Sequence, residues 1–146
     1  RGLGDVYKRQ DLALAADADG LHLGQNDLPL PVARKLLPID KILGCSTTSV
    51  EQAVTAQSEG ADYIAVGSIY PTSFKETAVV VGIERLRQVR QAVKVPLVAI
   101  GGINRDNAAE VMAAGADSIA MISAILQAED IEKATREIAN IISGEK

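Results

Sequence analysis

The sequence predicts an α/β fold in which helices flank a parallel β-sheet. Five short apolar runs lack a clean alternation of polar and apolar residues, which is typical of strands covered on both faces. Segments with helical periodicity separate these runs. The pair Ala-Asp precedes an apolar run three times, in "ADGLHL", "ADYIAV" and "ADSIAM", which indicates a repeated βα unit.

The five expected strands are spaced at intervals that suit βα units. They comprise residues 20–24, 41–46, 63–69, 96–100 and 118–123. Helices are expected over residues 31–37, 50–58, 83–93, 107–114 and 131–142. Thr48 and Glu51 have the spacing of a capping box, and Gly115 is expected to end the fourth helix. In the helix expected over residues 83–93, the aliphatic part of the Arg90 side chain, its stem, occupies an apolar position.

Two architectures fit this pattern, a (β/α)₈ barrel and an open doubly wound sheet. A complete barrel needs eight strands, so five strands indicate an open sheet or a part of a barrel. The first ten residues, "RGLGDVYKRQ", are basic and show no periodicity. We interpret residues 1–10 as a tail that is not native to the fold, and residues 11–146 as one domain.

Composition excludes several classes of function. The chain of 146 residues has a net charge of −4 and is 47% apolar. One cysteine, Cys45, excludes an internal disulfide and fits a reducing cytosol. The sequence lacks a long apolar run for a membrane span, and its acidic balance argues against nucleic acid as a partner. A cytoplasmic protein is therefore expected, and the sequence leaves homo-oligomerisation open.

In both architectures ligands bind beyond the carboxyl ends of the strands. After the first strand, Asp27 is a candidate Mg²⁺ ligand, because this ion prefers carboxylate oxygens and substrate phosphates. The alternative is that Asp27 caps the turn before Pro29. His22, the only histidine, is interpreted as a hydrogen-bonded core residue.

Small hydroxyl groups and glycines follow the later strands. Ser46 and its neighbours could bind phosphate or pyrimidine nitrogens, although Thr48 is also needed as a helix cap. The segment "YPTSFK" brings hydroxyl groups and the ammonium group of Lys75, unless it is only a solvated loop. The segments "AIGGIN" and "MISAI" offer close backbone approach at glycine and further donors. Such a site suits the ionisation of a diphosphate leaving group.

The motifs "DGLHLGQNDLP", "ILGCST", "DYIAVGSIYPTSFK", "VAIGGIN" and "MISAI" follow in this order. Together they resemble the thiamine-phosphate synthase (thiamine-phosphate pyrophosphorylase) family over residues 11–146. The resemblance implies a TIM (β/α)₈ barrel that uses Mg²⁺. It also implies a transferase of thiamine biosynthesis, which joins hydroxymethylpyrimidine diphosphate to hydroxyethylthiazole phosphate and releases pyrophosphate.

The resemblance also assigns residues. Asp27 would bind Mg²⁺, and Ser46 and Lys75 would act in catalysis on the pyrimidine diphosphate. Further substrate-binding positions, mainly for the thiazole phosphate, would be Thr72, Ser73, Phe74, Gly102, Ile122 and Ser123. Phe74 stands where the family usually has threonine, so only its backbone N–H would serve.

The sequence departs from the family pattern most strongly in the segment before Asp11. The family has an Asn-Asp pair where this sequence has Tyr7 and Lys8, and lysine cannot bind Mg²⁺. The chain thus resembles a C-terminal fragment, strands four to eight of the parent barrel, and the fragment alone is expected to be inactive.

Three other functions stay open from the sequence. One is a non-catalytic phosphate-binding barrel relative or regulator. A thiazole tautomerase-like isomerase is the second, although Thr47 and Thr48 stand where such an enzyme has a histidine. A sugar-phosphate epimerase is the third, and it needs an acid–base pair that the sequence does not offer.

Overall fold

The computed structural model describes residues 15–72 and 79–144 and contains a five-stranded parallel sheet in the order β1-β2-β3-β4-β5. The strands are β1 (Gly20–Leu23), β2 (Ile42–Thr47), β3 (Tyr63–Val66), β4 (Leu97–Ile100) and β5 (Ser118–Ala120). Every strand overlaps its predicted run, so the predicted parallel α/β fold is confirmed. The assignment of these strands to part of a closed barrel stays a prediction, and residues 1–10 lie outside the described residues.

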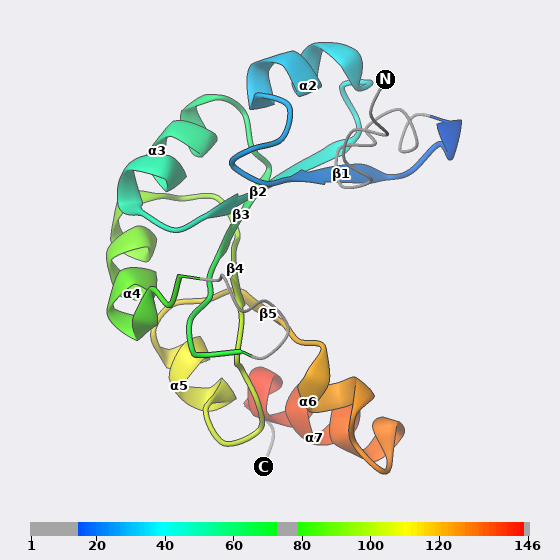
Figure 1. Cartoon of the computed structure of the whole chain (residues 1–146), viewed down its shortest axis with the longest axis vertical. Helices are drawn as coiled ribbons and strands as arrows, with labels where there is room; N and C mark the ends of the chain where they lie inside the picture. Colours follow the sequence, from blue (N-terminus) through cyan, green and yellow to red (C-terminus); the bar gives the residue numbers. More distant parts are fainter. Residues whose placement is uncertain (1–14, 73–78, 145–146) are drawn as a thin grey trace.

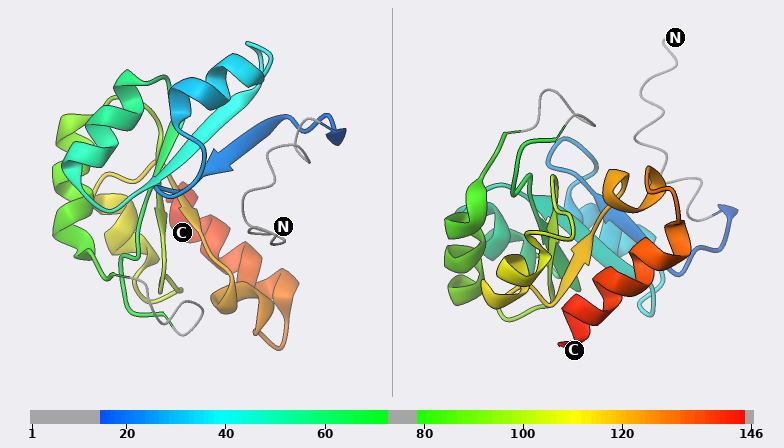
Figure 2. Two further views of the ribbon diagram at one scale, coloured as in Figure 1. Left: turned by 45° about the horizontal axis from the view of Figure 1, so that its top comes forward. Right: turned by 90° about the horizontal axis from the view of Figure 1, so that it is seen from below.

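Each strand is followed along the chain by one or two helices. They are α2 (Leu30–Leu36), α3 (Val50–Ser58), α4 (Gly82–Ala92), α5 (Ala108–Ala113), α6 (Ser123–Leu126) and α7 (Ile131–Ser143). Figure 1 shows α2 to α5 as an arc with the strands on its inner side. Figure 2 shows β1 at one end of the sheet and α7 at the other, where α7 packs against α5 and α6. In the described part of the chain, no helix has the length and apolar character of a membrane span.

The core lies between the outer face of the sheet and the helices. Alternation along β2 and β3 turns Leu43, Ile64 and Val66 toward the helices, where all three are fully buried. Leu86 and Val89 of α4 are also fully buried. Each such side chain stabilises the fold by about 1.5–3 kcal/mol relative to an exposed position. The opposite, inner face is less covered and carries the polar residues described below.

The start of α3 differs from the predicted capping box. Ser49, not Thr48, is the N-cap, and its Oγ accepts the backbone N–H of Gln52 at 3.2 Å. The Oε1 of Gln52 in turn accepts the N–H of Thr48 at 2.7 Å. The capping pair therefore lies one residue later than predicted, and Ser49 and Gln52 have the same capping-box spacing as Thr48 and Glu51. Gly115 does end α5 as predicted, with φ +103.

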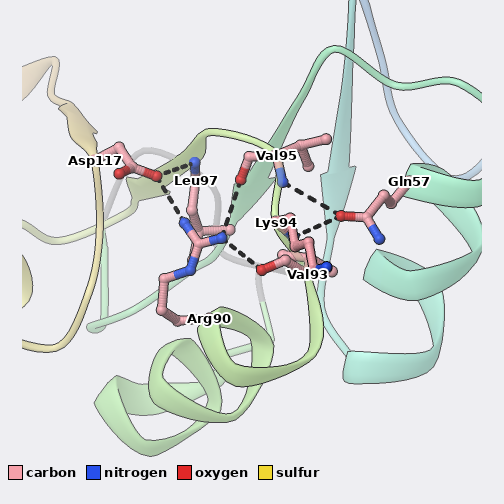
Figure 3. A network of polar contacts seen from close by, with 7 residues as sticks. All are labelled: Gln57, Arg90, Val93, Lys94, Val95, Leu97 and Asp117. Atoms are coloured by element: carbon pink, nitrogen blue, oxygen red, sulfur yellow. Dashed lines mark hydrogen bonds and ion pairs between the residues drawn. The ribbon is translucent and has the colours of Figure 1, made fainter.

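A polar network at the amino ends of the strands includes Asp117, the aspartate of the last Ala-Asp pair (Figure 3). The Oδ2 of Asp117 accepts the N–H of Leu97 at 2.8 Å and an N–H of Arg90 at 2.8 Å. Arg90 also donates to the carbonyl groups of Val93 and Val95. Its stem lies against Gly115, where a Cβ atom would be 2.6 Å from the Arg90 Cγ. The stem of Arg90 thus packs as predicted, while its guanidinium group ties α4 to β4 and β5.

The same arrangement recurs two strands earlier. The Oδ2 of Asp62 accepts the N–H of Leu43 at 2.7 Å and an N–H of Arg34 at 2.6 Å. Partial burial alone would raise the pKa of Asp62, but these hydrogen bonds and the nearby Arg34 charge bring it below its ordinary value. Two of the three Ala-Asp pairs, those of Asp62 and Asp117, thus form structural latches at the end of the sheet opposite the candidate site.

Candidate functional site

A hollow of about 460 Å³ lies at the carboxyl ends of the strands. Segments that follow all five strands contribute to its wall, as expected for a parallel α/β protein. No charged side chain belongs to the wall among the described residues. The lining residues are Gly24, Gln25, Asn26, Ser46, Thr47, Thr48, Ala65, Gly67, Ser68, Thr72, Val79, Ile100, Gly101, Gly102, Ile103, Ala120, Met121, Ile122 and Ser123.

The structure brings most of the predicted site residues to this one hollow. Five of them, distant from one another in the sequence, lie in its wall: Ser46, Thr72, Gly102, Ile122 and Ser123. Ser73, Phe74 and Lys75 lie outside the described residues. Asp27 does not line the hollow, although its neighbours Gln25 and Asn26 do. The roles of all these residues stay predictions.

Asp27 has a clear structural role in the turn after β1. Its Oδ2 accepts the N–H of Gly24 at 2.6 Å, and its own N–H donates to the Gly24 carbonyl at 3.1 Å. Asp27 thus caps this turn, and its role as a Mg²⁺ ligand stays a prediction. Within the described residues, no three or more His, Cys, Asp or Glu side chains group as a metal site. One carboxylate is still compatible with Mg²⁺, because this ion is often held by one or two carboxylates plus substrate phosphates.

His22 lies on the inner face of the sheet and is exposed, so its assignment to the core is wrong. The prediction that it is hydrogen-bonded is correct. Its Nε2 lies 2.8 Å from the Oγ of Ser46, and its Nδ1 lies 2.8 Å from the hydroxyl of Tyr63. Neighbouring protein atoms still displace part of the water around the His22 ring, which lowers its pKa, and the charge of Asp27 partly offsets this. Burial likewise raises the pKa of Tyr63.

The two glycines after β4 let two loops approach closely. Gly101 and Gly102 have φ of +98 and +65, which glycine adopts readily. A Cβ at Gly102 would lie 2.5 Å from the Pro71 carbonyl oxygen and 2.7 Å from the Tyr70 Cβ. A Cβ at Gly101 would overlap Ser68. The segment that approaches these glycines is the loop after β3, and their approach to a ligand stays a prediction.

That loop is held in place by further hydrogen bonds. The N–H of Tyr70 donates to the Gly101 carbonyl at 3.0 Å, and the Ser68 hydroxyl donates to the Tyr70 carbonyl at 2.7 Å. The Tyr70 hydroxyl donates to Glu110 of α5 at 2.9 Å. Partial burial, followed by this bond to the carboxylate, raises the pKa of Tyr70. These contacts position Thr72 at the wall of the hollow.

Two contributors to the site were missed from the sequence. The Gln25 side chain donates to the Ser46 carbonyl at 2.7 Å, and Tyr63 contacts His22 across β2. Gly44 was the signal for the second contact, because a glycine inside a strand often marks a close approach. The described wall of the hollow offers hydroxyl groups and backbone N–H groups near glycines, and it contains no charged side chain. Such a set can bind a phosphorylated ligand whose charge is balanced by groups at the rim.

A family model and individual related sequences place this chain in the same protein family. A family model described as Thiamine monophosphate synthase matches residues 6–125. The Thiamine-phosphate synthase of Pyrococcus furiosus is 52% identical over 137 residues, which cover 94% of this chain and 66% of that protein. The Thiamine-phosphate synthase of Moorella thermoacetica is 52% identical over 139 residues, with the same two shares of 94% and 66%. The chain thus spans just under two thirds of the length of these curated relatives.

Solved structures are similar as well. The Thiamine phosphate pyrophosphorylase from Pyrococcus furiosus superposes with a TM-score of 0.86 at 48% identity, over 94% of this chain and 66% of that one. The thiamine phosphate pyrophosphorylase from Bacteroides thetaiotaomicron gives a TM-score of 0.65 at 20% identity, over 95% of this chain and 69% of that one. The second similarity concerns the fold alone.

Proposed function

Because this chain belongs to the thiamine monophosphate synthase family, we propose that its full-length gene product makes thiamine phosphate. The substrates would be 4-amino-2-methyl-5-hydroxymethylpyrimidine diphosphate and hydroxyethylthiazole phosphate, with pyrophosphate as the second product. One observation carries the proposal beyond family membership. Ser46, Thr72, Gly102, Ile122 and Ser123, which the resemblance assigns to the two substrates, line a single hollow.

The chemistry that this site supports is dissociative. The bond between the pyrimidine methylene carbon and the diphosphate oxygen breaks, and its electron pair leaves with pyrophosphate. The lone pair of the thiazole nitrogen then forms a C–N bond to the methylene carbon. Ser46 would hold the pyrimidine diphosphate, while Thr72, Gly102 and Ser123 would hold the thiazole phosphate near it. Catalysis then rests on positioning and on stabilising the departing negative charge.

Mg²⁺ and Lys75 would supply the positive charge that the described wall lacks. Asp27 is the described residue that fits the ion, since a carboxylate plus diphosphate oxygens meets the needs of Mg²⁺. When bound, the ion would neutralise charge on the leaving diphosphate. The Asp27 side chain would then serve two purposes, because its Oδ2 also closes the turn onto Gly24.

The direct test is an assay of the full-length gene product with both substrates and Mg²⁺. We expect thiamine phosphate and pyrophosphate to form in equal amounts. Ser123→Ala should raise the KM for the thiazole phosphate about threefold to tenfold, the effect of one lost hydrogen bond. Ser118→Ala is the matched control, because Ser118 is exposed on β5 but does not line the hollow. Binding of both substrates without product would instead favour a non-catalytic relative.

Asp27→Asn separates the two roles of Asp27. The amide oxygen of asparagine can still accept the Gly24 N–H, so we expect the unfolding midpoint to change little. The lost negative charge should lower turnover at least tenfold and raise the Mg²⁺ concentration needed for half-maximal rate. Turnover measured against Mg²⁺ concentration checks this expectation.

Asp27→Ala provides the comparison for the turn. It removes the acceptor of the Gly24 N–H as well as the charge, and should cost about 1 kcal/mol of stability in addition to the loss of turnover. An asparagine variant with the Mg²⁺ dependence of the unchanged protein would show that Asp27 only caps the turn.

A further inference from the structure

The side chains of Tyr63, His22 and Ser46 form a hydrogen-bonded row on the inner face of the sheet. The row ends at the hollow, which Ser46 lines. The strand register places His22 of β1 beside Gly44 of β2, and Gly44 beside Tyr63 of β3. Because Gly44 has no side chain, the rings of His22 and Tyr63 meet above it, with centroids 5.4 Å apart. A Cβ at Gly44 would overlap the Tyr63 ring. The row continues from the His22 Nε2 to the Oγ of Ser46 at 2.8 Å.

The protonation of His22 decides what Ser46 can offer to a ligand. In a neutral imidazole one nitrogen donates and the other accepts. If Nε2 carries the proton, it donates to the Ser46 Oγ and leaves the serine hydrogen free for another acceptor. With the proton on Nδ1 instead, Nε2 takes the serine hydrogen, and Ser46 offers only lone pairs. An anionic ligand needs the first arrangement.

The tyrosine hydroxyl favours that first arrangement. A phenol is a better donor than an aliphatic hydroxyl, because it is the stronger acid. Burial raises the pKa of Tyr63, which favours its protonated hydroxyl, and desolvation lowers the pKa of His22, which favours its neutral ring. Each condition is required for Tyr63 to donate to Nδ1 and for His22 to donate from Nε2.

We propose that Tyr63 is a positioning residue: its hydroxyl donates to His22 Nδ1, which keeps the proton of His22 on Nε2 and leaves the Ser46 hydroxyl hydrogen free to bind a diphosphate oxygen. The choice of diphosphate as ligand rests on the proposed function. Tyr63 itself does not line the hollow, and it acts through His22 and Ser46.

Nitrogen-15 NMR tests the tautomer directly, because His22 is the only histidine and gives one pair of ring signals. In the full-length gene product the His22 signals are identified by their loss in a His22→Gln variant, and we expect Nε2 to carry the proton. Tyr63→Phe keeps the ring above Gly44 but removes the hydroxyl, and should move the proton partly to Nδ1. Tyr70→Phe is the matched control, because the Tyr70 hydroxyl donates to Glu110 instead, and it should leave the His22 signals unchanged.

Titration with inorganic pyrophosphate and Mg²⁺ tests the link to Ser46. Ser46→Ala should weaken binding about threefold to tenfold, and Tyr63→Phe by part of that factor. The double variant should bind no more weakly than Ser46→Ala alone, since Tyr63 acts through Ser46.

Three results would overturn the proposal. They are a proton on Nδ1 in the unchanged protein, His22 signals that Tyr63→Phe does not move, and additive losses of pyrophosphate binding in the double variant. None of these measurements needs turnover. A full-length gene product that shows the expected tautomer and coupling but forms no thiamine phosphate would contradict the proposed function alone.

Discussion

Gly102→Ala is expected to lower kcat/KM for thiamine phosphate formation about 100-fold or more, because misplacement of a site by about 1 Å has effects of this size. The new Cβ would lie 2.5 Å from the Pro71 carbonyl oxygen and 2.7 Å from the Tyr70 Cβ. Both contacts involve the segment that carries Thr72, and the first is with backbone. A backbone segment cannot relieve this collision by changing a rotamer, as a flexible side chain could. The segment that carries Thr72 must therefore move away from Gly102.

Gly144→Ala is the control that separates backbone strain from this collision. Gly144 has φ +72, close to the +65 of Gly102, but among the described residues outside its own helix no atom lies within 4 Å of the position of its Cβ. Both variants should lose about 1–2 kcal/mol of stability to the left-handed conformation. Only Gly102→Ala should also lose turnover. Equal kcat/KM values in the two variants would show that the contact between the two loops does not position the site.

The elements of the fold could be predicted from the sequence, because local features specify them. The apolar runs predicted the five strands, and Gly115 predicted the end of α5. The cap of α3 was misplaced by one residue, because Thr48–Glu51 and Ser49–Gln52 both have the spacing of a capping box. The helix α6 (Ser123–Leu126) was missed, because four residues are too few to show helical periodicity.

The gathering of site residues could be predicted for a different reason. In any parallel sheet the carboxyl ends of the strands meet at one edge, so Ser46, Gly102 and Ser123 had to lie on the same side. The contact between His22 and Ser46 could not be predicted in this way. It depends on the register of β1 against β2, and apolar runs covered on both faces do not indicate a register. His22 was therefore assigned to the core instead of the inner face.

Asp117→Ala is expected to be the most destabilising of the substitutions considered, with a loss of about 2–3 kcal/mol in the free energy of unfolding. Removing the acceptor leaves the N–H of the fully buried Leu97 without this hydrogen bond, which costs about 1–3 kcal/mol. The lost ion pair with Arg90 adds less, because both side chains are partly exposed and such pairs contribute about 0–1 kcal/mol. Urea unfolding followed by circular dichroism measures the sum.

Asp117→Asn divides this sum into its two parts. The asparagine oxygen can still accept from Leu97, whereas the charge that attracts Arg90 is lost, so we expect a cost of about 1 kcal/mol or less. The exposed Asp40 supplies the control, and Asp40→Ala should change stability by no more than about 0.5 kcal/mol. If Asp117→Asn is as destabilising as Asp117→Ala, the ion pair with Arg90 rather than the Leu97 hydrogen bond supplies most of the stability that Asp117 contributes.

The latch at Asp62 extends this prediction to the internal repeat. Asp62 accepts from Leu43 and Arg34 as Asp117 accepts from Leu97 and Arg90, so Asp62→Ala should cost a similar amount. Both latches lie at the amino ends of the strands, away from the hollow. We therefore expect that, at temperatures where the variants remain folded, their KM values for both substrates match those of the unchanged protein. A raised KM would mean that the two ends of the sheet are coupled.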